Sequence, residues 1–174
     1  ITWTSTNEST LFESVPSNIL STKTNVFDTY TNPTTKKYNV LLKQQTTEDA
    51  IKGVKSEDTF TYDGLVDSDS SYGLRTQSVA RKFSGTTLQG TTTTTTTYDN
   101  NPTGEGNAYY IGRPSTINTT TAISTGDSRS ASETYTYTGA NLTKTEKTGH
   151  NTSYAIVEEM TYDNVGNLLT KKVS

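Results

Sequence analysis

Apolar and polar residues alternate along much of the chain with the period of two that is typical of β-strands. The alternation is clearest in residues 58–64, 91–99 and 133–139, which are built mainly from Thr, Tyr and Phe. Residues i and i+2 of a strand lie on one face, so Tyr135 and Tyr137 share a face and threonines fill the other. Each stretch ends in Gly, Asp or Asn, which favour turns. The pattern therefore predicts antiparallel β-hairpins.

The first part of the chain alternates more weakly. In residues 1–45, short apolar clusters are separated by Ser, Asn, Thr and Pro, which predicts short strands with polar turns. Only residues 46–53 carry helix start and stop signals, and they span a single turn. We therefore expect an all-β chain whose hairpins form an extended or curved sheet. It has a β-rich segment at residues 1–45 and hairpin repeats at residues 46–174.

An internal repeat is visible in the last third of the chain. Residues 137–144 resemble residues 162–171, and weaker copies begin at Tyr62 and Tyr98, so the period is not strict. Repetition of this kind indicates one supersecondary unit used several times. In each copy Tyr closes a strand, Asp or Asn caps a turn, Gly supplies a positive φ and Leu begins the return strand. The residues assigned to these turns are Tyr62, Asp63, Gly64, Tyr98, Asp99, Tyr137, Gly139, Asn141, Leu142, Tyr162, Asp163, Gly166, Asn167 and Leu168.

Composition limits the size of the core. Hydrophobic residues make up 29% of the 174 residues, against roughly 45–50% in ordinary globular domains. Thr and Tyr replace the missing aliphatic residues, and both fit a half-buried pleated surface. The net charge of −3 leaves no basic surface for nucleic acid. A thin sheet without a large core is expected.

Several other protein classes are excluded by simple counts. The chain has no Cys, so disulfides and Cys-ligated zinc are ruled out. No apolar run approaches the roughly 18 residues that a membrane-spanning helix needs. The sequence opens at Ile1 without an initiator Met or an apolar leader, so we expect a processed product or a piece of a longer protein.

Residues that often carry chemistry are scattered rather than grouped. His150 is the only imidazole, and a general base would need an oriented nucleophile beside it. The adjacent carboxylates at 57–58 and 158–159 point to opposite faces of a strand and do not converge as a glycosidase requires. The alternating carboxylates at 67–71 lack the Gly and distal Glu of a calcium loop. We therefore expect no enzyme activity, no catalytic residue, no metal and no cofactor.

The threonine run at residues 91–97 is a candidate edge for strand pairing. It contains neither Pro nor a charge, so unpaired backbone groups there would act as a template for another strand. We expect such edges to be covered by further repeats of the same polypeptide or by identical subunits. The threonines of this candidate edge are Thr91, Thr93, Thr95 and Thr97.

The fullest repeat, Thr161-Tyr162-Asp163-Asn164-Val165-Gly166-Asn167-Leu168-Leu169, resembles the RHS or YD-repeat family, which is named for a Tyr-Asp pair followed by a Gly-Asn-Leu turn. Residues 98–114 are similar to a spacer of toxin-complex and SpvB-like RHS proteins, because Tyr98-Asp99-Asn100 leads to an aromatic-Ile-Gly-Arg stretch. The resemblance covers about residues 46–174. The copies at Tyr62 and Tyr98 depart from it because they lack the Gly-Asn-Leu turn.

This resemblance implies a non-enzymatic structural role. RHS hairpins wind into a sheet that closes as a hollow shell, which in bacterial toxins encloses a C-terminal cytotoxic polypeptide. The chain is then expected to be a shell segment of a secreted or cell-surface bacterial protein, with further repeats and a toxin passenger as its partners. The alternative is a self-assembling extracellular subunit, a pilin-like filament or an adhesin, joined by strand addition.

Overall fold

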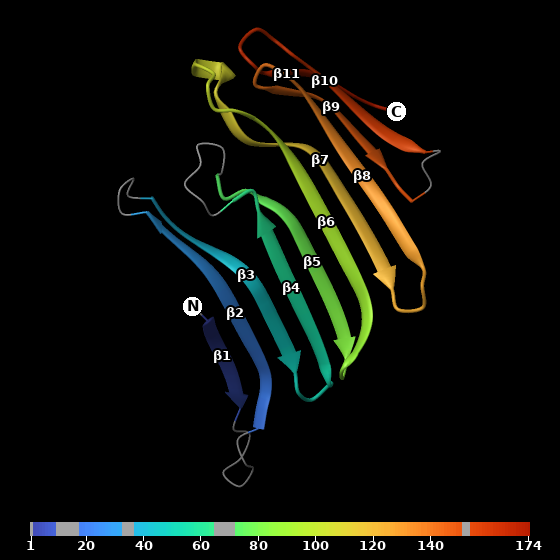
Figure 1. Cartoon of the computed structure of the whole chain (residues 1–174). Helices are drawn as coiled ribbons and strands as arrows, with labels where there is room; N and C mark the ends of the chain where they lie inside the picture. The colour runs from blue at the N-terminus through green and yellow to red at the C-terminus, as the bar shows by residue number, and fades with distance from the viewer. Residues whose placement is uncertain (1, 10–17, 33–36, 65–71, 151–153) are drawn as a thin grey trace. The chain divides into compact units, whose positions relative to one another are not determined.

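The computed structural model describes residues 2–9, 18–32, 37–64, 72–150 and 154–174. These residues are predominantly β-strand (Figure 1), which confirms the predicted all-β fold of antiparallel hairpins. Within them the only helical element is the three-residue 3-10 helix Gly106–Ala108. The candidate calcium loop at residues 67–71 lies outside the described residues. The strands are β1 (Thr2–Ser9), β2 (Asn18–Asn32), β3 (Lys37–Asp49), β4 (Val54–Tyr62), β5 (Arg75–Ser84), β6 (Thr87–Asn101), β7 (Tyr110–Ile123), β8 (Ser128–Thr138), β9 (Asn141–Thr148), β10 (Ala155–Tyr162) and β11 (Leu168–Val173).

The strands pair in the order in which they occur along the chain. The hydrogen-bonded order runs from β1 to β11 without a crossover, so β1 and β11 each have a partner strand on one side. Two compact units are present, Ile1–Thr93 with Thr121–Asp127 and Thr94–Thr120 with Ser128–Ser174. The boundary after residue 45 that the sequence indicates falls inside β3 and differs from this division.

The helical signals at residues 46–53 do not produce a helix. Thr46 lies in β3, and the chain then turns back into β4. The carboxylate of Asp49 accepts hydrogen bonds from the backbone N–H groups of Ile51 and Lys52, at 3.1 and 2.9 Å. Gly53 completes the turn with a φ of 61°. These capping contacts are common to helix starts and tight turns, which explains why the sequence signals were ambiguous.

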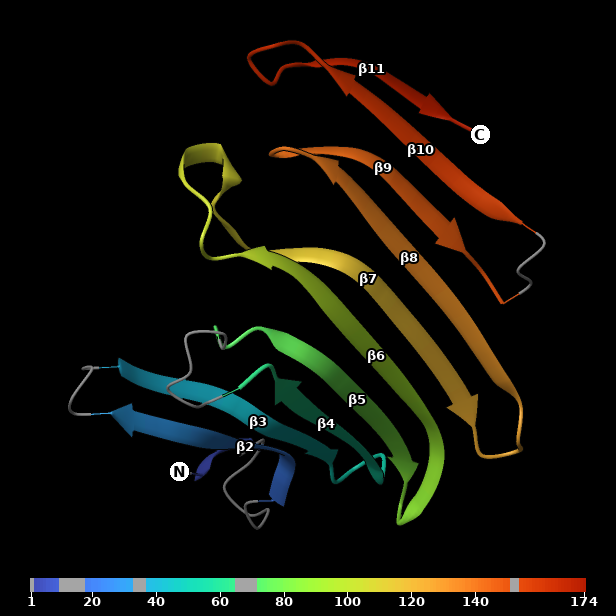
Figure 2. The same ribbon diagram turned by 45° about the horizontal axis from the view of Figure 1, so that its top comes forward.

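Each unit is a single layer of sheet (Figure 2). No apolar side chain in the described part of either unit is buried, and apolar residues such as Ile156 and Val165 remain 57% and 75% exposed. Thr145 is the one buried residue among those described, at 5% exposure. Ladder hydrogen bonds and cross-strand side-chain pairs therefore hold the strands together in place of a core. This agrees with the low hydrophobic content.

The interpretation of the threonine run as a free edge is wrong. Thr91, Thr93, Thr95 and Thr97 lie in β6, which stands between β5 and β7 in the strand order. The hydroxyl of Thr97 lies 2.6 Å from the hydroxyl of Thr116 on β7. The run lacks a protective charge or Pro because neighbouring strands of the same chain already cover its backbone groups. The free edges belong to β1 and β11 instead.

Candidate functional site

The Tyr-Asp turn between β10 and β11 is held by the aspartate. The carboxylate of Asp163 accepts hydrogen bonds from the backbone N–H of Val165 at 3.0 Å and of Asn167 at 2.8 Å. The side-chain amide of Asn167 donates a third bond at 2.8 Å. These bonds favour the charged carboxylate, and they hold the pKa of Asp163 below its usual value. Gly166 completes the turn with a φ of 90°.

The turn after Tyr62 has the same construction with a long insertion. The backbone N–H of Asp63 donates to the carbonyl of Leu74, and the N–H of Leu74 donates back to the Asp63 carboxylate at 2.9 Å. In the other turn Asp163 and Asn167 exchange the equivalent pair of bonds. Gly73, with a φ of 71°, therefore corresponds to Gly166.

Sequence reasoning missed this correspondence. It assigned the turn to Gly64, which directly follows the aspartate, because the pattern was read without gaps. The glycine with the positive φ that precedes the return strand is Gly73. Its signal was Gly73-Leu74-Arg75, a variant of the Gly-Asn-Leu turn displaced along the chain.

The two remaining copies use different turns. After Tyr137, Thr138 pairs with Asn141 across a two-residue turn in which Gly139 has a φ of 59°. After Tyr98, the residue Asp99 is still part of β6. There the side chain of Asn100 accepts a 2.7 Å bond from the backbone N–H of Gly112.

A β-bulge accompanies the tyrosine in each hairpin whose register is described. Tyr62 lies opposite Arg75, Tyr137 opposite Leu142 and Tyr162 opposite Leu168, and the register shifts by one residue immediately before each pair. A bulge leaves one residue of the return strand without a partner and bends the strand. We call the residue opposite the tyrosine the bulge residue. In the β2–β3 hairpin Phe27 takes the place of the tyrosine and Leu42 is the bulge residue.

The hydroxyl of each of these tyrosines donates to the preceding hairpin. Tyr62 donates to the carbonyl oxygen of Leu42 at 2.8 Å, and Tyr162 donates to that of Leu142 at 2.8 Å. Tyr137 donates to the carbonyl oxygen of Pro114 at 3.1 Å. Partial burial raises the pKa of the Tyr62 and Tyr137 hydroxyls, which keeps them protonated as donors. A bulge residue of one hairpin is thus the acceptor for the tyrosine of the next.

The spacing of this contact is the same at both fully described junctions. The β3–β4 ladder ends with the pair of Gln44 and Thr59, and the β9–β10 ladder ends with Lys144 and Glu159. In each case the tyrosine comes three residues after the last ladder residue of its strand. Its acceptor comes two residues before the last ladder residue of the other strand. The hydroxyl therefore binds the carbonyl just beyond the point where the backbone ladder stops.

An arginine is enclosed between aromatic rings beside one of these contacts. The guanidinium of Arg113 lies 3.8 Å from the ring centre of Tyr110 and 4.0 Å from that of Tyr137. It also donates to the carbonyl oxygen of Gly139 at 2.9 Å. Cation–π contacts of this kind stabilise a half-buried cation. The sequence showed the aromatic-Ile-Gly-Arg stretch but not that Tyr137 would form the second side of the stack.

Polar side chains link the strands of the second unit across one face. Tyr135 donates to Glu133 at 2.6 Å, and this bond raises the pKa of Tyr135 to about 12. The buried Thr145 donates to Glu158 at 3.2 Å. Glu158 also pairs with Lys171 of β11 at 3.0 Å, and this bond lowers the pKa of the carboxyl. A continuous polar connection therefore joins β9, β10 and β11.

The outer strand of this face, β11, is exposed along its whole length. Leu168, Leu169 and Val173 are 54%, 63% and 60% exposed. Val157 of β10 exchanges both backbone hydrogen bonds with Ser174 at 2.9 Å. Because antiparallel strands alternate in the direction of their backbone groups, those of Lys171 point away from β10. This edge is an unsatisfied row of donors and acceptors.

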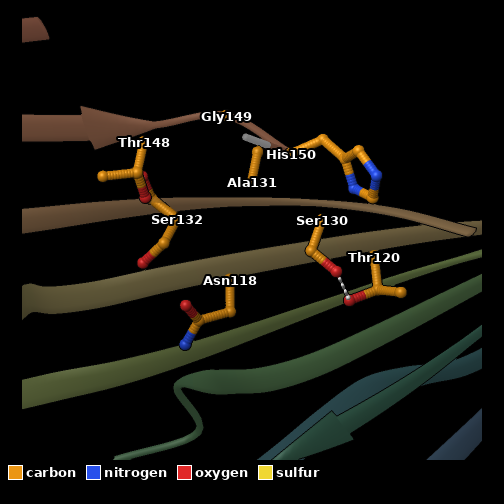
Figure 3. A pocket seen from close by; sticks show the side chains of 8 residues that line it. All are labelled: Asn118, Thr120, Ser130, Ala131, Ser132, Thr148, Gly149 and His150. Atoms are coloured by element: carbon orange, nitrogen blue, oxygen red, sulfur yellow. Dashed lines mark hydrogen bonds between the residues drawn. The ribbon is translucent and has the colours of Figure 1, made fainter. Parts of the chain in front are cut away.

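His150 lies at a shallow polar hollow of about 290 Å³ (Figure 3). Thr120 and Ser130 in its lining are hydrogen-bonded to each other at 3.1 Å. No described residues form a group of three or more side chains suited to a metal ion. The adjacent carboxylates serve separate contacts: Glu57 pairs with Arg81 at 3.1 Å, whereas Asp58 lies opposite Gln45.

Comparison of the chain with protein-family models, with curated proteins and with solved structures finds no match. Within its described part no helix has the length and apolar character needed to span a membrane.

Proposed function

We propose that this chain is a non-enzymatic structural segment of a secreted or cell-surface bacterial protein. Its hairpins are repeats of RHS type, and they form part of a shell that encloses or presents a toxin. The observation that carries this proposal is a fold in which successive hairpins dock by one repeated tyrosine contact while no described apolar side chain is buried. The repeated contact supports a module made to be extended laterally.

The uncovered faces support a role within a larger assembly. A sheet normally buries one face against a second layer. Here Tyr154 and Ile156 are 78% and 57% exposed, and no second layer covers the described residues. An enclosed polypeptide, or the neighbouring parts of a shell, would supply the missing layer.

The alternative function is a self-assembling filament or adhesin subunit. The free edges of β1 and β11 favour it, because strand addition between copies would satisfy the backbone groups at both edges. A heterologous contact of this type builds an open filament rather than a closed ring. The shell and the filament therefore share one prediction, which is lateral growth of the sheet.

Sedimentation velocity of the full chain across the micromolar range tests this shared prediction. We expect concentration-dependent association, because exposed strand edges pair with one another. A soluble monomer that binds no dye specific for exposed apolar surface would contradict both proposals. An immunoblot of the producing cells then separates them. A band far larger than 19.0 kDa supports a shell polypeptide, and a subunit-sized band in shed fibres supports a filament.

A further inference from the structure

We propose that the free edge of β11 is a register-specific docking edge for one kind of partner. The partner is an antiparallel strand with a tyrosine and with an acidic residue four positions before it. Its tyrosine hydroxyl donates to the carbonyl oxygen of Leu168, and its carboxylate lies opposite Lys171. This inference rests on the proposed function, since it specifies how the lateral growth is directed.

The tyrosine contacts within the chain define the register. Leu42 and Leu142 are bulge residues, and each accepts the hydroxyl of the next hairpin's tyrosine. Leu168 is the bulge residue of the last hairpin, because it lies opposite Tyr162 at the same register shift. Its carbonyl therefore occupies the position of the next acceptor. By the same spacing, the backbone ladder with an incoming strand would end at Thr170.

The strands that carry donor tyrosines also share an acidic position. The residue four positions before the tyrosine is Asp58 in β4, Glu133 in β8 and Glu158 in β10. In the described ladders this residue lies opposite the residue three positions after the bulge residue, as in the pairs of Asp58 with Gln45 and Glu158 with Thr145. Neither of those partners carries a charge.

At the β11 edge the equivalent partner is a cation. Three positions after Leu168 stands Lys171, which is exposed and already pairs with Glu158 at 3.0 Å. A strand of the donor type placed in this register would bring a second carboxylate to the other side of the same ammonium group. Opposite charges directly across a ladder stabilise the pair, and like charges destabilise it. The edge therefore favours a donor strand over a second copy of β11, which would bring lysines close to lysines.

The backbone at this edge fits the same register. The alternation set by Val157 and Ser174 directs the N–H and C=O groups of Lys171 and Val173 away from β10. In the proposed register, these residues would form the narrow hydrogen-bonded pairs with the incoming strand. Lys172 already bonds toward β10 and has no role in the docking ladder.

A synthetic peptide of residues 128–138 is the probe, because β8 contains both the tyrosine and a single acidic residue. Its binding to the full chain is measured by fluorescence anisotropy at a concentration where the chain sediments as a monomer. Amide exchange of the chain reports the location. We expect the amides of Lys171 and Val173 to exchange rapidly alone and slowly with the peptide. The amide of Lys172 is the internal reference and should change little.

Matched variants test the two specific contacts. The peptide change Tyr137→Phe removes the hydroxyl donor and should weaken binding about five-fold. The chain variant Lys171→Glu should weaken binding on the order of ten-fold. Glu133→Lys in the peptide should restore binding to that variant. The control is Lys172→Glu, which reverses the neighbouring charge on the other face of β11 and should leave binding within two-fold, roughly the scatter of surface substitutions.

Three results overturn the inference. They are binding that protects other amides, equal binding of the Tyr137→Phe peptide, and a failure of the two charge reversals to compensate. If the chain still associates with itself in any of these cases, the proposed function survives and only the docking register is wrong. If neither peptide binding nor self-association occurs, both are wrong.

Discussion

The turns after Asp63 and Asp163 are the same structure made by different lengths of chain. In both, the aspartate exchanges backbone bonds with the residue that precedes the return strand, and its carboxylate accepts from that residue's N–H. One return strand begins at Arg75, twelve residues after its aspartate, and the other at Leu168, five residues after. The register thus depends on the aspartate, the glycine and the bulge. The number of residues between them does not determine it.

The largest expected effect comes from the glycines that the two turns share. Gly166→Val should destabilise the chain by roughly 1–3 kcal/mol, because its φ is unfavourable for a β-branched residue. The site has space for a side chain, since the nearest atom to an added Cβ is 3.8 Å away, so the penalty is backbone strain. Gly73→Val should cost about as much if the turns are equivalent. Urea unfolding followed by circular dichroism measures both.

Gly149→Ala is the control for these variants, because nothing lies within 4 Å of an added Cβ there and its backbone needs no positive φ. An unchanged unfolding midpoint for Gly166→Val would contradict the assignment of this turn. A large loss for one glycine and none for the other would show that the insertion changes the turn.

Removing the insertion tests the comparison directly. Residues 64–72 can be replaced by Asn-Val, the pair that stands between Asp163 and Gly166. If the two turns are equivalent, the shortened chain should fold with the same circular dichroism. It should be more stable by about 1 kcal/mol, because a shorter loop costs less entropy to close. Loss of β-structure in this variant would mean that the insertion itself positions Gly73.

The tyrosine contacts provide a smaller and symmetric test. Tyr62→Phe and Tyr162→Phe each remove one 2.8 Å hydrogen bond to a neighbouring hairpin. Each should cost about 1 kcal/mol in urea unfolding. Tyr154→Phe is the matched control, since Tyr154 is 78% exposed, and it should have no measurable effect. Equal stability of all three variants would remove the docking role from the hydroxyl.

Acid should weaken the turn at Asp163 by the smallest amount. The pKa of this carboxyl is below its usual 3.8 in the folded chain, so its contribution is complete above that value. The contribution is lost as the pH falls through the lower folded pKa. Asp163→Asn should therefore reduce the slope of unfolding temperature against pH below about pH 4. An identical acid slope in the variant and the unmodified chain would contradict the capping role of the carboxylate.

The strand content and the compact turn at Gly166 could be predicted from the sequence because both depend on local patterns. Alternation of Thr and Tyr specifies strands, and a Gly flanked by Asn and Val in a Tyr-Asp repeat specifies a tight turn. The interior position of the threonine run was not predictable in this way. Whether a strand is covered depends on its neighbours in space, and the run itself contains no signal for them.

The tyrosine–carbonyl contacts and the Arg113 stack were also beyond sequence reasoning. A backbone carbonyl accepts a hydrogen bond whatever side chain its residue carries, so the acceptor leaves no mark in the sequence. The stack joins Arg113 to Tyr137 across two strands, and only the strand register brings them together. Long-range pairing of this type follows from topology rather than from local composition.

The choice of acceptor has a consequence for how these hairpins tolerate mutation. The acceptor residues are Leu42, Pro114 and Leu142, and Pro serves there because it lacks only the N–H and keeps its carbonyl. The donor must be a tyrosine, whereas the acceptor position is free to change. Selection therefore acts on one side of each junction only. Hairpins can diverge from one another by drift at half of their contact positions and still assemble in the same order.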